Sequence, residues 1–231
     1  MMLRGAITCA LFVGASFVAA QPFVWHDVGG GEDIAFAKRD GFWTLIEAVS
    51  AIEEREMRDV VVAMNGGMFH ASSTPVGLFI ESGNEQVPLN TESGLRGNFF
   101  LLPNGVFGRD EGGRYRVETT AAAAAVSWRD ATQSGPMLLI GGAVHPAFNP
   151  DSENRRIRNG AGIRPDGSVA LGISTEPVTL YEMAMAFRER GCTDALYLDG
   201  GISQIYKEGR LLPEDAPGEF AVVIAVLAPA R

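Results

Sequence analysis

The sequence predicts an α+β fold, in which one domain contains a mixed, largely antiparallel sheet with two main helices packed on it. Short apolar runs separated by hairpin-type turns occupy most of the 231 residues. Two segments instead have apolar residues at helical spacing. Strands and helices do not alternate regularly, and no Pro/Ser-rich linker divides the chain, which favours α+β over a repeated βαβ arrangement.

Both predicted helices are amphipathic. Apolar residues recur at helical spacing over 42–57. The second helix has clearer ends, because Thr179 and Glu182 form a capping-box pattern and Gly191 follows the last apolar turn. The small-residue run at 121–126 fits a helical turn and a strand equally well.

The predicted strands are short, and most of them form hairpins. Continuous apolar runs at 60–64 and 220–228 are typical of buried strands, as is "ALYL" at 195–198. Turn residues between apolar arms predict four hairpins. In chain order these turns are "SGN" after "PVGLFIE", Asn104-Gly105 after "GNFFLLP", Gly141-Gly142 after "PMLLI", and "PDGS" after "AGIR".

Residues 1–20 have the pattern of a secretory signal peptide. Arg4 precedes an apolar stretch at 5–18, and "VAA" ends it. The stretch is shorter than the ~20 residues of a membrane span, although an uncleaved anchor is the alternative. We therefore expect an exported protein, periplasmic or extracellular, whose domain of 21–231 has no membrane contact after signal removal.

Charge and side-chain chemistry narrow the class of partner. The formal net charge of −9 argues against nucleic acid as a partner, since phosphate recognition needs a basic face. Cys192 is the one cysteine beyond the signal segment, and we expect it to be buried as a small hydrophobe. The three histidines are scattered and no cysteine has zinc-ligand spacing, so we predict neither a metal site nor a cofactor.

Two constructions in the chain are alike. Each is a buried strand, then a small polar side chain, then two glycines: Asn65-Gly66-Gly67 in "AMNGGMF" and Asp199-Gly200-Gly201 in "YLDGGIS". A glycine pair lets the backbone approach a ligand closely and permits positive φ, so that N–H groups can face a cleft. Asn-Gly and Asp-Gly are also the commonest hairpin turns, and either motif alone is explained as well by a turn.

A basic cluster stands out in this acidic chain. Arg155, Arg156 and Arg158 occur within "ENRRIRNGAG". A guanidinium group matches phosphate or carboxylate with two parallel hydrogen bonds, so the cluster can be an anion clamp. A solvated loop is the alternative. Arg158 lies nearest the glycine-rich piece and is the preferred anion ligand.

Taken in order, "MNGGMF", "QSGPML", "RNGAG" and "LYLDGGIS" resemble the signatures of the phosphodiester glycosidase family. That family includes the enzyme that uncovers a sugar phosphodiester by removing N-acetylglucosamine. Further segments, among them "TPVGLFIE" and "HPAFNP", resemble a bacterial exported branch. The resemblance covers roughly 60–226. Ile202 stands where the animal-type pattern has a third glycine, which leaves the substrate open.

The resemblance implies hydrolysis of a sugar-1-phosphodiester at its C1–O bond. The leaving phosphomonoester is already a stable anion and needs little protonation. The enzyme must instead stabilise its negative charge and an oxocarbenium-like sugar. Arg158 is the catalytic candidate for the first role and Asp199 for the second. Asp199 could attack C1 or activate water. A turn aspartate that caps its own backbone is the alternative.

Other residues are candidates for substrate binding. The backbone N–H groups of the two glycine pairs would assist with negative charge, and Asn65 would orient sugar hydroxyls or the phosphate. The set also includes Ser203, His70 and Glu176. For each of them the alternative is a turn or surface residue without a role in binding. Sequence distance does not show whether Asp199 has a second carboxylate within reach, so retention and inversion both stay open.

Two further classes of function stay open. One is a noncatalytic envelope module that binds an anionic glycan in the same cleft. The other is a metal-dependent phosphoesterase that cleaves the P–O bond. The expected partner is in every case a sugar phosphodiester or an anionic glycan, and the sequence does not predict the oligomeric state.

Overall fold

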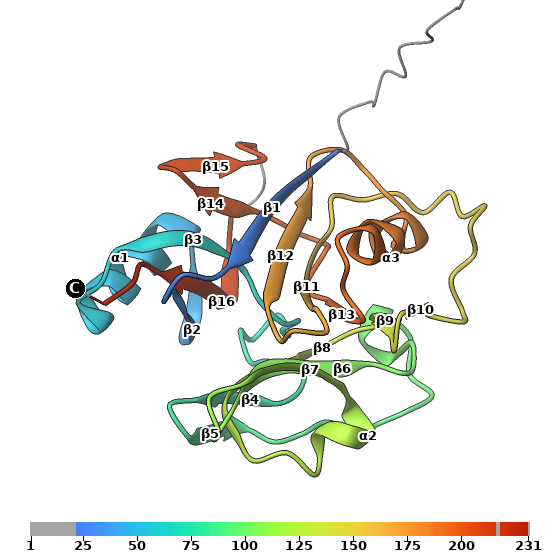
Figure 1. Ribbon diagram of the computed structural model, residues 1–231, viewed down its shortest axis with the longest axis horizontal. Helices are drawn as coiled ribbons and strands as arrows, with labels where there is room; N and C mark the ends of the chain where they lie inside the picture. The colour runs from blue at the N-terminus through green and yellow to red at the C-terminus, as the bar shows by residue number, and fades with distance from the viewer. Residues whose placement is uncertain (1–21, 216–217, 231) are drawn as a thin grey trace, which may run out of the picture.

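The computed structural model describes residues 22–215 and 218–230. Within them, three antiparallel sheets enclose one apolar core (Figure 1). This confirms the α+β prediction and divides the predicted strands among three sheets. The predicted signal peptide lies outside the described residues. No helix in the described part of the chain is both long enough and apolar enough to cross a membrane.

The first sheet carries α3, Leu180–Glu189. Its strands, from one edge to the other, are β1 (Phe23–Val28), β12 (Val169–Ser174), β11 (Asn159–Ile163), β13 (Asp194–Tyr197), β9 (Met137–Ile140) and β10 (Ala143–Val144). Phe187 of α3 packs so closely on β11 that a Cβ on Gly160 or Gly162 would lie 3.0 Å or 2.7 Å from its ring. The glycines of "RNGAG" therefore make room for the helix.

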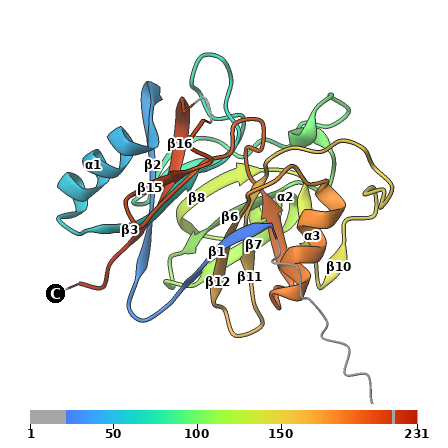
Figure 2. The same cartoon turned by 90° about the horizontal axis from the view of Figure 1, so that it is seen from above.

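The second sheet carries α1, Leu45–Glu56, on its outer face. Its strands in spatial order are β15 (Arg210–Leu212), β14 (Ile205–Lys207), β3 (Val60–Asn65), β16 (Phe220–Leu227) and β2 (Asp33–Trp43). The predicted start of the helix at 42 is wrong by three residues, because β2 continues through Trp43 and the Thr44 side chain caps the helix. The views in Figures 1 and 2 place α1 and α3 on opposite flanks of the molecule.

The third sheet has no long helix. Its order is β5 (Asn84–Val87), β4 (Phe79–Glu81), β8 (Trp128–Ser134), β6 (Gly105–Asp110) and β7 (Tyr115–Thr119). The short α2, Thr120–Ala123, shows that the small-residue run begins as a helical turn. A 3-10 turn, Asn98–Phe100, precedes β6.

Three of the four predicted hairpins are confirmed, and the one at Asn104-Gly105 is wrong. The Asn104 side chain is buried; it donates to the Phe99 carbonyl and accepts from the Thr120 hydroxyl. Pro103 also cannot donate to a strand ladder. The chain before Asn104 therefore folds as an irregular segment, and β6 pairs with β7 instead.

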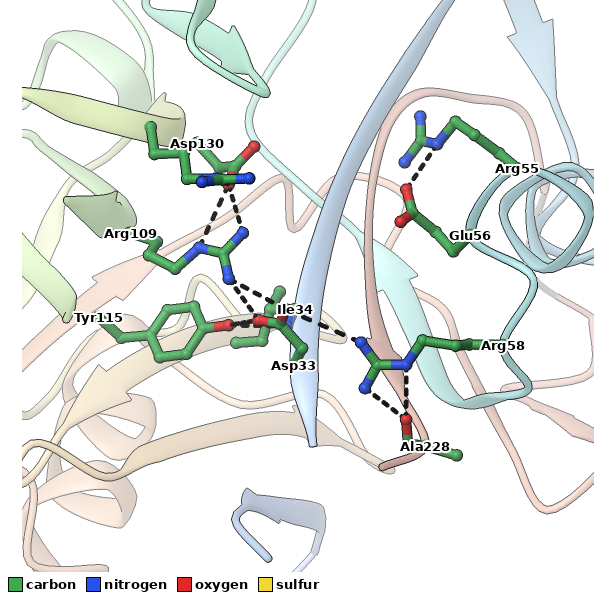
Figure 3. A network of polar contacts seen from close by, with 10 residues as sticks. Asp33, Ile34, Arg55, Glu56, Arg58, Arg109, Tyr115, Asp130 and Ala228 are labelled. Atoms are coloured by element: carbon green, nitrogen blue, oxygen red, sulfur yellow. Dashed lines mark hydrogen bonds and ion pairs between the residues drawn. The ribbon is translucent and has the colours of Figure 1, made fainter. Parts of the chain in front are cut away.

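A polar network joins the second and third sheets (Figure 3). Arg109 of β6 donates to Asp33, the first residue of β2, at 2.8 Å and to Asp130 of β8 at 2.9 Å. The Tyr115 hydroxyl also donates to Asp33. Burial raises the pKa of the Asp33 carboxyl, but the bond from Tyr115 and the charge of Arg109 outweigh it, so the pKa lies below its ordinary value.

Candidate functional site

The ends of β3 and β13 meet where the first and second sheets adjoin. Asn65 ends β3, and Asp199 follows β13 by two residues. The Asp199 N–H donates to the Gly66 carbonyl at 3.1 Å. The two similar polar-Gly-Gly motifs are therefore neighbours in space, although 134 residues separate them in the chain.

The Asn65 amide is fully buried and is engaged with protein groups. Its Nδ2 donates to the Asp199 carbonyl at 2.6 Å, and its Oδ1 accepts from the Gln204 N–H at 3.0 Å. The Asn159 amide donates to both oxygens of Asn65, at 2.8 Å and 3.0 Å. Asn65 thus holds the Asp199 loop in place.

Ser203 belongs to the same network. Its hydroxyl is 3.2 Å from Asn159 Oδ1 and 3.3 Å from the Asp199 carbonyl. Asn159 was not predicted as a site residue, although it lies inside the quoted "RNGAG" motif. The missing signal is tertiary, since its partners Asn65 and Ser203 lie 94 and 44 residues away.

None of the four motif glycines is at positive φ. Close packing explains three of them. A Cβ on Gly66 would lie 2.7 Å from Val222, one on Gly67 would meet β8, and one on Gly200 would collide with the Tyr197 hydroxyl. A Cβ on Gly201 would meet only Asp199 Oδ1, at an ordinary contact distance of 3.6 Å, and the Gly201 N–H donates to the same carboxylate at 3.3 Å.

The Asp199 side chain is half-buried at the edge of this network. Burial raises the pKa of its carboxyl, and the hydrogen bond from the Gly201 N–H opposes that shift only in part. The neighbouring Gly201 is exposed, so the carboxylate lies close to solvent. A carboxyl group of this kind fits a role as base or nucleophile.

Arg158 is 1% exposed, and none of the described residues forms an ion pair with it. Its guanidinium donates to three neutral oxygens: the Val178 carbonyl at 2.8 Å, the Asn154 carbonyl at 2.9 Å and the Tyr197 hydroxyl at 2.9 Å. A buried charge is normally paired with an opposite charge. Arg158 therefore retains an unneutralised positive charge, as an anion site requires.

Tyr197 connects Arg158 with the Asp199 loop, and sequence reasoning missed it. Its buried hydroxyl accepts from Arg158 and also receives the Gly200 N–H. Burial raises the pKa of this phenol, with Arg158 opposing and Asp199 reinforcing the shift. The sequence contained one signal, because Tyr197 precedes Asp199 by two residues and alternate residues of a strand share a face.

His70 and Glu176 lie apart from this network. His70 is exposed in a turn, where its N–H donates to the Thr74 carbonyl. Glu176 is exposed too and lines a cavity of about 300 Å³ together with Arg155 and Glu182, which are themselves ion-paired at 2.7 Å. No contact in the described part of the chain joins either residue to Asp199.

Two hydroxyls of β8 lie buried without a hydrogen-bond partner among the described residues, those of Thr132 and Ser134. A Cβ on Gly67 would lie 2.4 Å from Thr132 Oγ1. Ser134 begins the quoted "SGP" segment, whose Pro136 accepts the Tyr197 N–H. A buried polar atom without a partner costs about 1–3 kcal/mol of stability.

The remaining chemistry of the described residues is sparse. They contain no group of three or more His, Cys, Asp or Glu side chains placed to hold a metal ion. Cys192 is buried as predicted, and burial raises the pKa of its thiol to about 11, which makes it a poor nucleophile.

Comparison with known proteins places this arrangement in context. A family model described as phosphodiester glycosidase matches residues 58–223. The chain is 36% identical over 174 residues to YigE of Escherichia coli (strain K12), which is described as uncharacterized, covering 74% of this chain and 67% of that protein.

Two solved structures resemble the fold at low sequence identity. One is the catalytic domain of zebrafish N-acetylglucosamine-1-phosphodiester alpha-N-acetylglucosaminidase, auto-inhibited by its pro-peptide, with a TM-score of 0.62 and 14% identity over 89% of this chain and 82% of that one. The other is a hypothetical protein from Synechocystis, with a TM-score of 0.61 and 13% identity over 89% of this chain and 59% of that one.

Proposed function

Because this chain belongs to the phosphodiester glycosidase family, we propose that it hydrolyses a glycosyl-1-phosphodiester at the sugar C1–O bond. Asp199 acts at C1 and Arg158 carries the negative charge of the phosphate. The substrate is an envelope or extracellular glycan ester, and the protein is exported by its segment 1–20. The homologous glycosidase from zebrafish acts, by its name, on a sugar-1-phosphodiester, which supports this substrate class.

One observation carries the proposal: a buried, unneutralised guanidinium is linked through a single hydroxyl to the backbone of the loop that carries a half-buried carboxylate. Arg158 reaches the Tyr197 hydroxyl, and the same hydroxyl receives the N–H of Gly200, the residue after Asp199. An anionic leaving group and a carboxylate that acts on the sugar need these two charges near each other but not paired together.

The proposed reaction needs little acid catalysis. The C1–O bond breaks with its electron pair moving to the phosphate oxygen, and the guanidinium of Arg158 stabilises the charge that gathers there. The Asp199 carboxylate either attacks C1 or takes a proton from the water that does so. Both roles require the ionised carboxylate.

The other residues of the network position these two groups. Asn65, Asn159 and Ser203 hold the backbone of the Asp199 loop, and the engaged amide of Asn65 makes it a positioning residue more than a direct ligand. The Gly201 N–H donates to the Asp199 carboxylate itself, at 3.3 Å. His70 and Glu176 are left out of the proposed site, because no contact links them to it.

The bond that breaks tests the proposal. Hydrolysis of a panel of sugar-1-phosphodiesters in ¹⁸O-labelled water should place the label on the sugar C1 hydroxyl and leave the phosphate unlabelled. Asp199→Asn should lower turnover by about 10³-fold or more while ligand binding persists. Asp40→Asn changes a fully exposed carboxylate in the same way and should retain activity.

Other outcomes would identify a different function. Label on the phosphate together with loss of activity in a chelator would indicate a metal-dependent phosphoesterase. Binding of the glycan ester without turnover, unchanged in Asp199→Asn, would indicate a noncatalytic binding module. Either result contradicts the proposed hydrolysis at C1.

A further inference from the structure

A groove lies along one face of α3, between this helix, the start of β1 and the segment 176–178. Its volume is about 300 Å³, at the lower end of the range of about 300–1,000 Å³ that is usual for small-ligand sites. The α3 residues that line it recur at helical spacing: Tyr181, Glu182, Met185, Ala186 and Glu189. From Tyr181 to Glu189 the helix rises by about 12 Å, so the groove follows most of its length.

The floor of the groove is apolar. It is formed by side chains without charge or hydrogen-bonding groups: Pro22, Phe23, Pro177, Val178, Met185 and Ala186. Phe23 and Met185 are partly exposed, so they present apolar surface to a ligand. Covering this surface with an aliphatic chain removes apolar area from water, which is favourable.

The charged side chains of the groove leave an excess of negative charge. Three glutamates and one arginine line it, and Arg155 is paired with Glu182 at 2.7 Å. The remaining two glutamates, Glu176 and Glu189, are exposed. Neither of their carboxylates has an ion pair or a hydrogen bond among the residues that the structure describes. Both are therefore free to bind a cation.

These two carboxylates belong to opposite ends of the groove. Thr175, directly before Glu176, donates its N–H to the Pro22 carbonyl at 2.8 Å, just before β1 begins. Arg190, directly after Glu189, is ion-paired with Asp27 near the end of β1. At about 3.3 Å for each strand residue, Pro22 and Asp27 are about 16 Å apart along β1. The apolar floor lies between the two carboxylates.

We infer that this groove binds a linear aliphatic diamine, with one ammonium group at each end and the methylene chain on the apolar floor. The negative charge of the groove favours a cation over an anion or a neutral ligand. An ammonium group pairs with a carboxylate only within about 4 Å, so one ammonium group occupies one end and a second is needed for the other. At about 30 Å³ for each water molecule, the groove holds the equivalent of about ten waters, which is enough for a diamine of six carbons.

The test compares three probes of the same length that differ in charge. These are 1,6-diaminohexane, 1-aminohexane and 1,6-hexanediol. An NMR titration of the full protein at neutral pH follows the methyl resonance of Met185, which lies in the floor of the groove. The diamine should bind about fivefold or more tightly than the monoamine, because only the diamine pairs with both carboxylates. The diol should bind more weakly than either amine.

Single variants locate the two ammonium groups. Glu176→Gln and Glu189→Gln each remove one negative charge and keep the shape of the side chain. Each should lower the affinity for the diamine to about that for the monoamine. Glu54→Gln is the matched control, because it removes an exposed glutamate of α1 on the opposite flank, and it should leave the preference for the diamine unchanged. All three side chains are exposed, so the variants should fold.

Three results would overturn the inference. Equal affinities for the diamine and the monoamine would show that the second carboxylate does not take part. A preference for the diamine that survives both Gln variants would place the binding elsewhere on the surface. Tightest binding of the diol would assign the groove to an uncharged partner. The titration involves no hydrolysis, and the described contacts of Asp199 include neither Glu176 nor Glu189, so the groove and the proposed function fail separately.

Discussion

Asn65 Nδ2 donates to the main-chain carbonyl of Asp199 at 2.6 Å, so an amide at the end of one sheet holds the acidic loop of another. Both members are part of a polar-Gly-Gly motif. Asn65 is fully buried, and loss of the bond would leave the Asp199 carbonyl without this donor. The geometry of the proposed catalytic loop therefore depends on a residue far away in the chain.

Replacing Asn65 tests this dependence. Asn65→Asp removes the donor and buries a negative charge against the Asp199 carbonyl, so the free energy of unfolding should fall by about 3 kcal/mol or more. Activity should fall further than stability alone explains, because the loop loses its position. Urea denaturation and initial rates measure the two effects. Asn84→Asp, at the exposed first residue of β5, should change neither.

The pH dependence of activity should report the raised pKa of Asp199. Because burial disfavours the ionised carboxylate, kcat/KM should decline on acidification at a higher pH than an ordinary aspartate would give. A pH–rate profile between pH 3 and about pH 8 measures the apparent pKa. A profile with no acidic limb above the ordinary aspartate range would contradict the assignment of Asp199 as base or nucleophile.

The same raised pKa has a consequence for stability. The folded protein binds the Asp199 proton more tightly than the unfolded chain does, so ionisation costs stability above the folded pKa, and the cost disappears as the pH falls below it. Asp199→Asn removes that cost and should be at least as stable as the natural protein at pH 7. The difference should shrink in denaturation experiments at lower pH.

Tyr197→Phe isolates the hydroxyl between Arg158 and the Asp199 loop. It leaves one guanidinium N–H and the Gly200 N–H without their acceptor, which should cost about 1–3 kcal/mol of stability. If the hydroxyl orients Arg158 and the Asp199 loop, kcat should fall while the Kd of an uncharged sugar ligand stays unchanged. Tyr206→Phe, on β14 of the second sheet, is the matched control. Equal kcat in both variants would limit Tyr197 to a structural role.

The contact between the second and third sheets predicts a stability effect without direct involvement in chemistry. Arg109→Gln removes the shorter of the ion pairs that Asp33 and Asp130 each make, and it should lower the free energy of unfolding by about 2 kcal/mol, between the values for surface and buried pairs. The pKa of Asp33 is lowered, so its contribution is present at neutral pH and is lost on acidification toward the folded pKa.

Two measurements check the sheet contact. Chemical denaturation at pH 7 and at low pH should show the effect of Arg109→Gln shrinking as Asp33 is protonated. Arg129→Gln removes a more exposed arginine that lies 3.9 Å from Asp130, and it should cost little at either pH. A large effect of Arg129→Gln would mean that the total positive charge near Asp130, and not the specific bonds of Arg109 in the network of Figure 3, stabilises the contact between the two sheets.

The sequence by itself determined the local elements, because their signals lie within a few residues. Thr179 and Glu182 cap α3 as predicted, and Gly141-Gly142 turns β9 into β10 with both glycines at positive φ. Only the tertiary structure decided which strands pair, since β1 pairs with β12, which lies far along the chain. It also decided that the Asn104 side chain is buried and donates to the Phe99 carbonyl. At Asn104, burial of the side chain outweighs the local preference for a hairpin turn.

The candidate site divides in the same way. The sequence indicated Asp199, Arg158 and the two glycine pairs, because their residue types limit the chemistry they can do. The folded chain decided that Asn65 supports a loop, that Tyr197 lies between the two charges, and that His70 and Glu176 lie elsewhere. Those relationships depend on hydrogen bonds and packing between distant segments, which no pattern of neighbouring residues records.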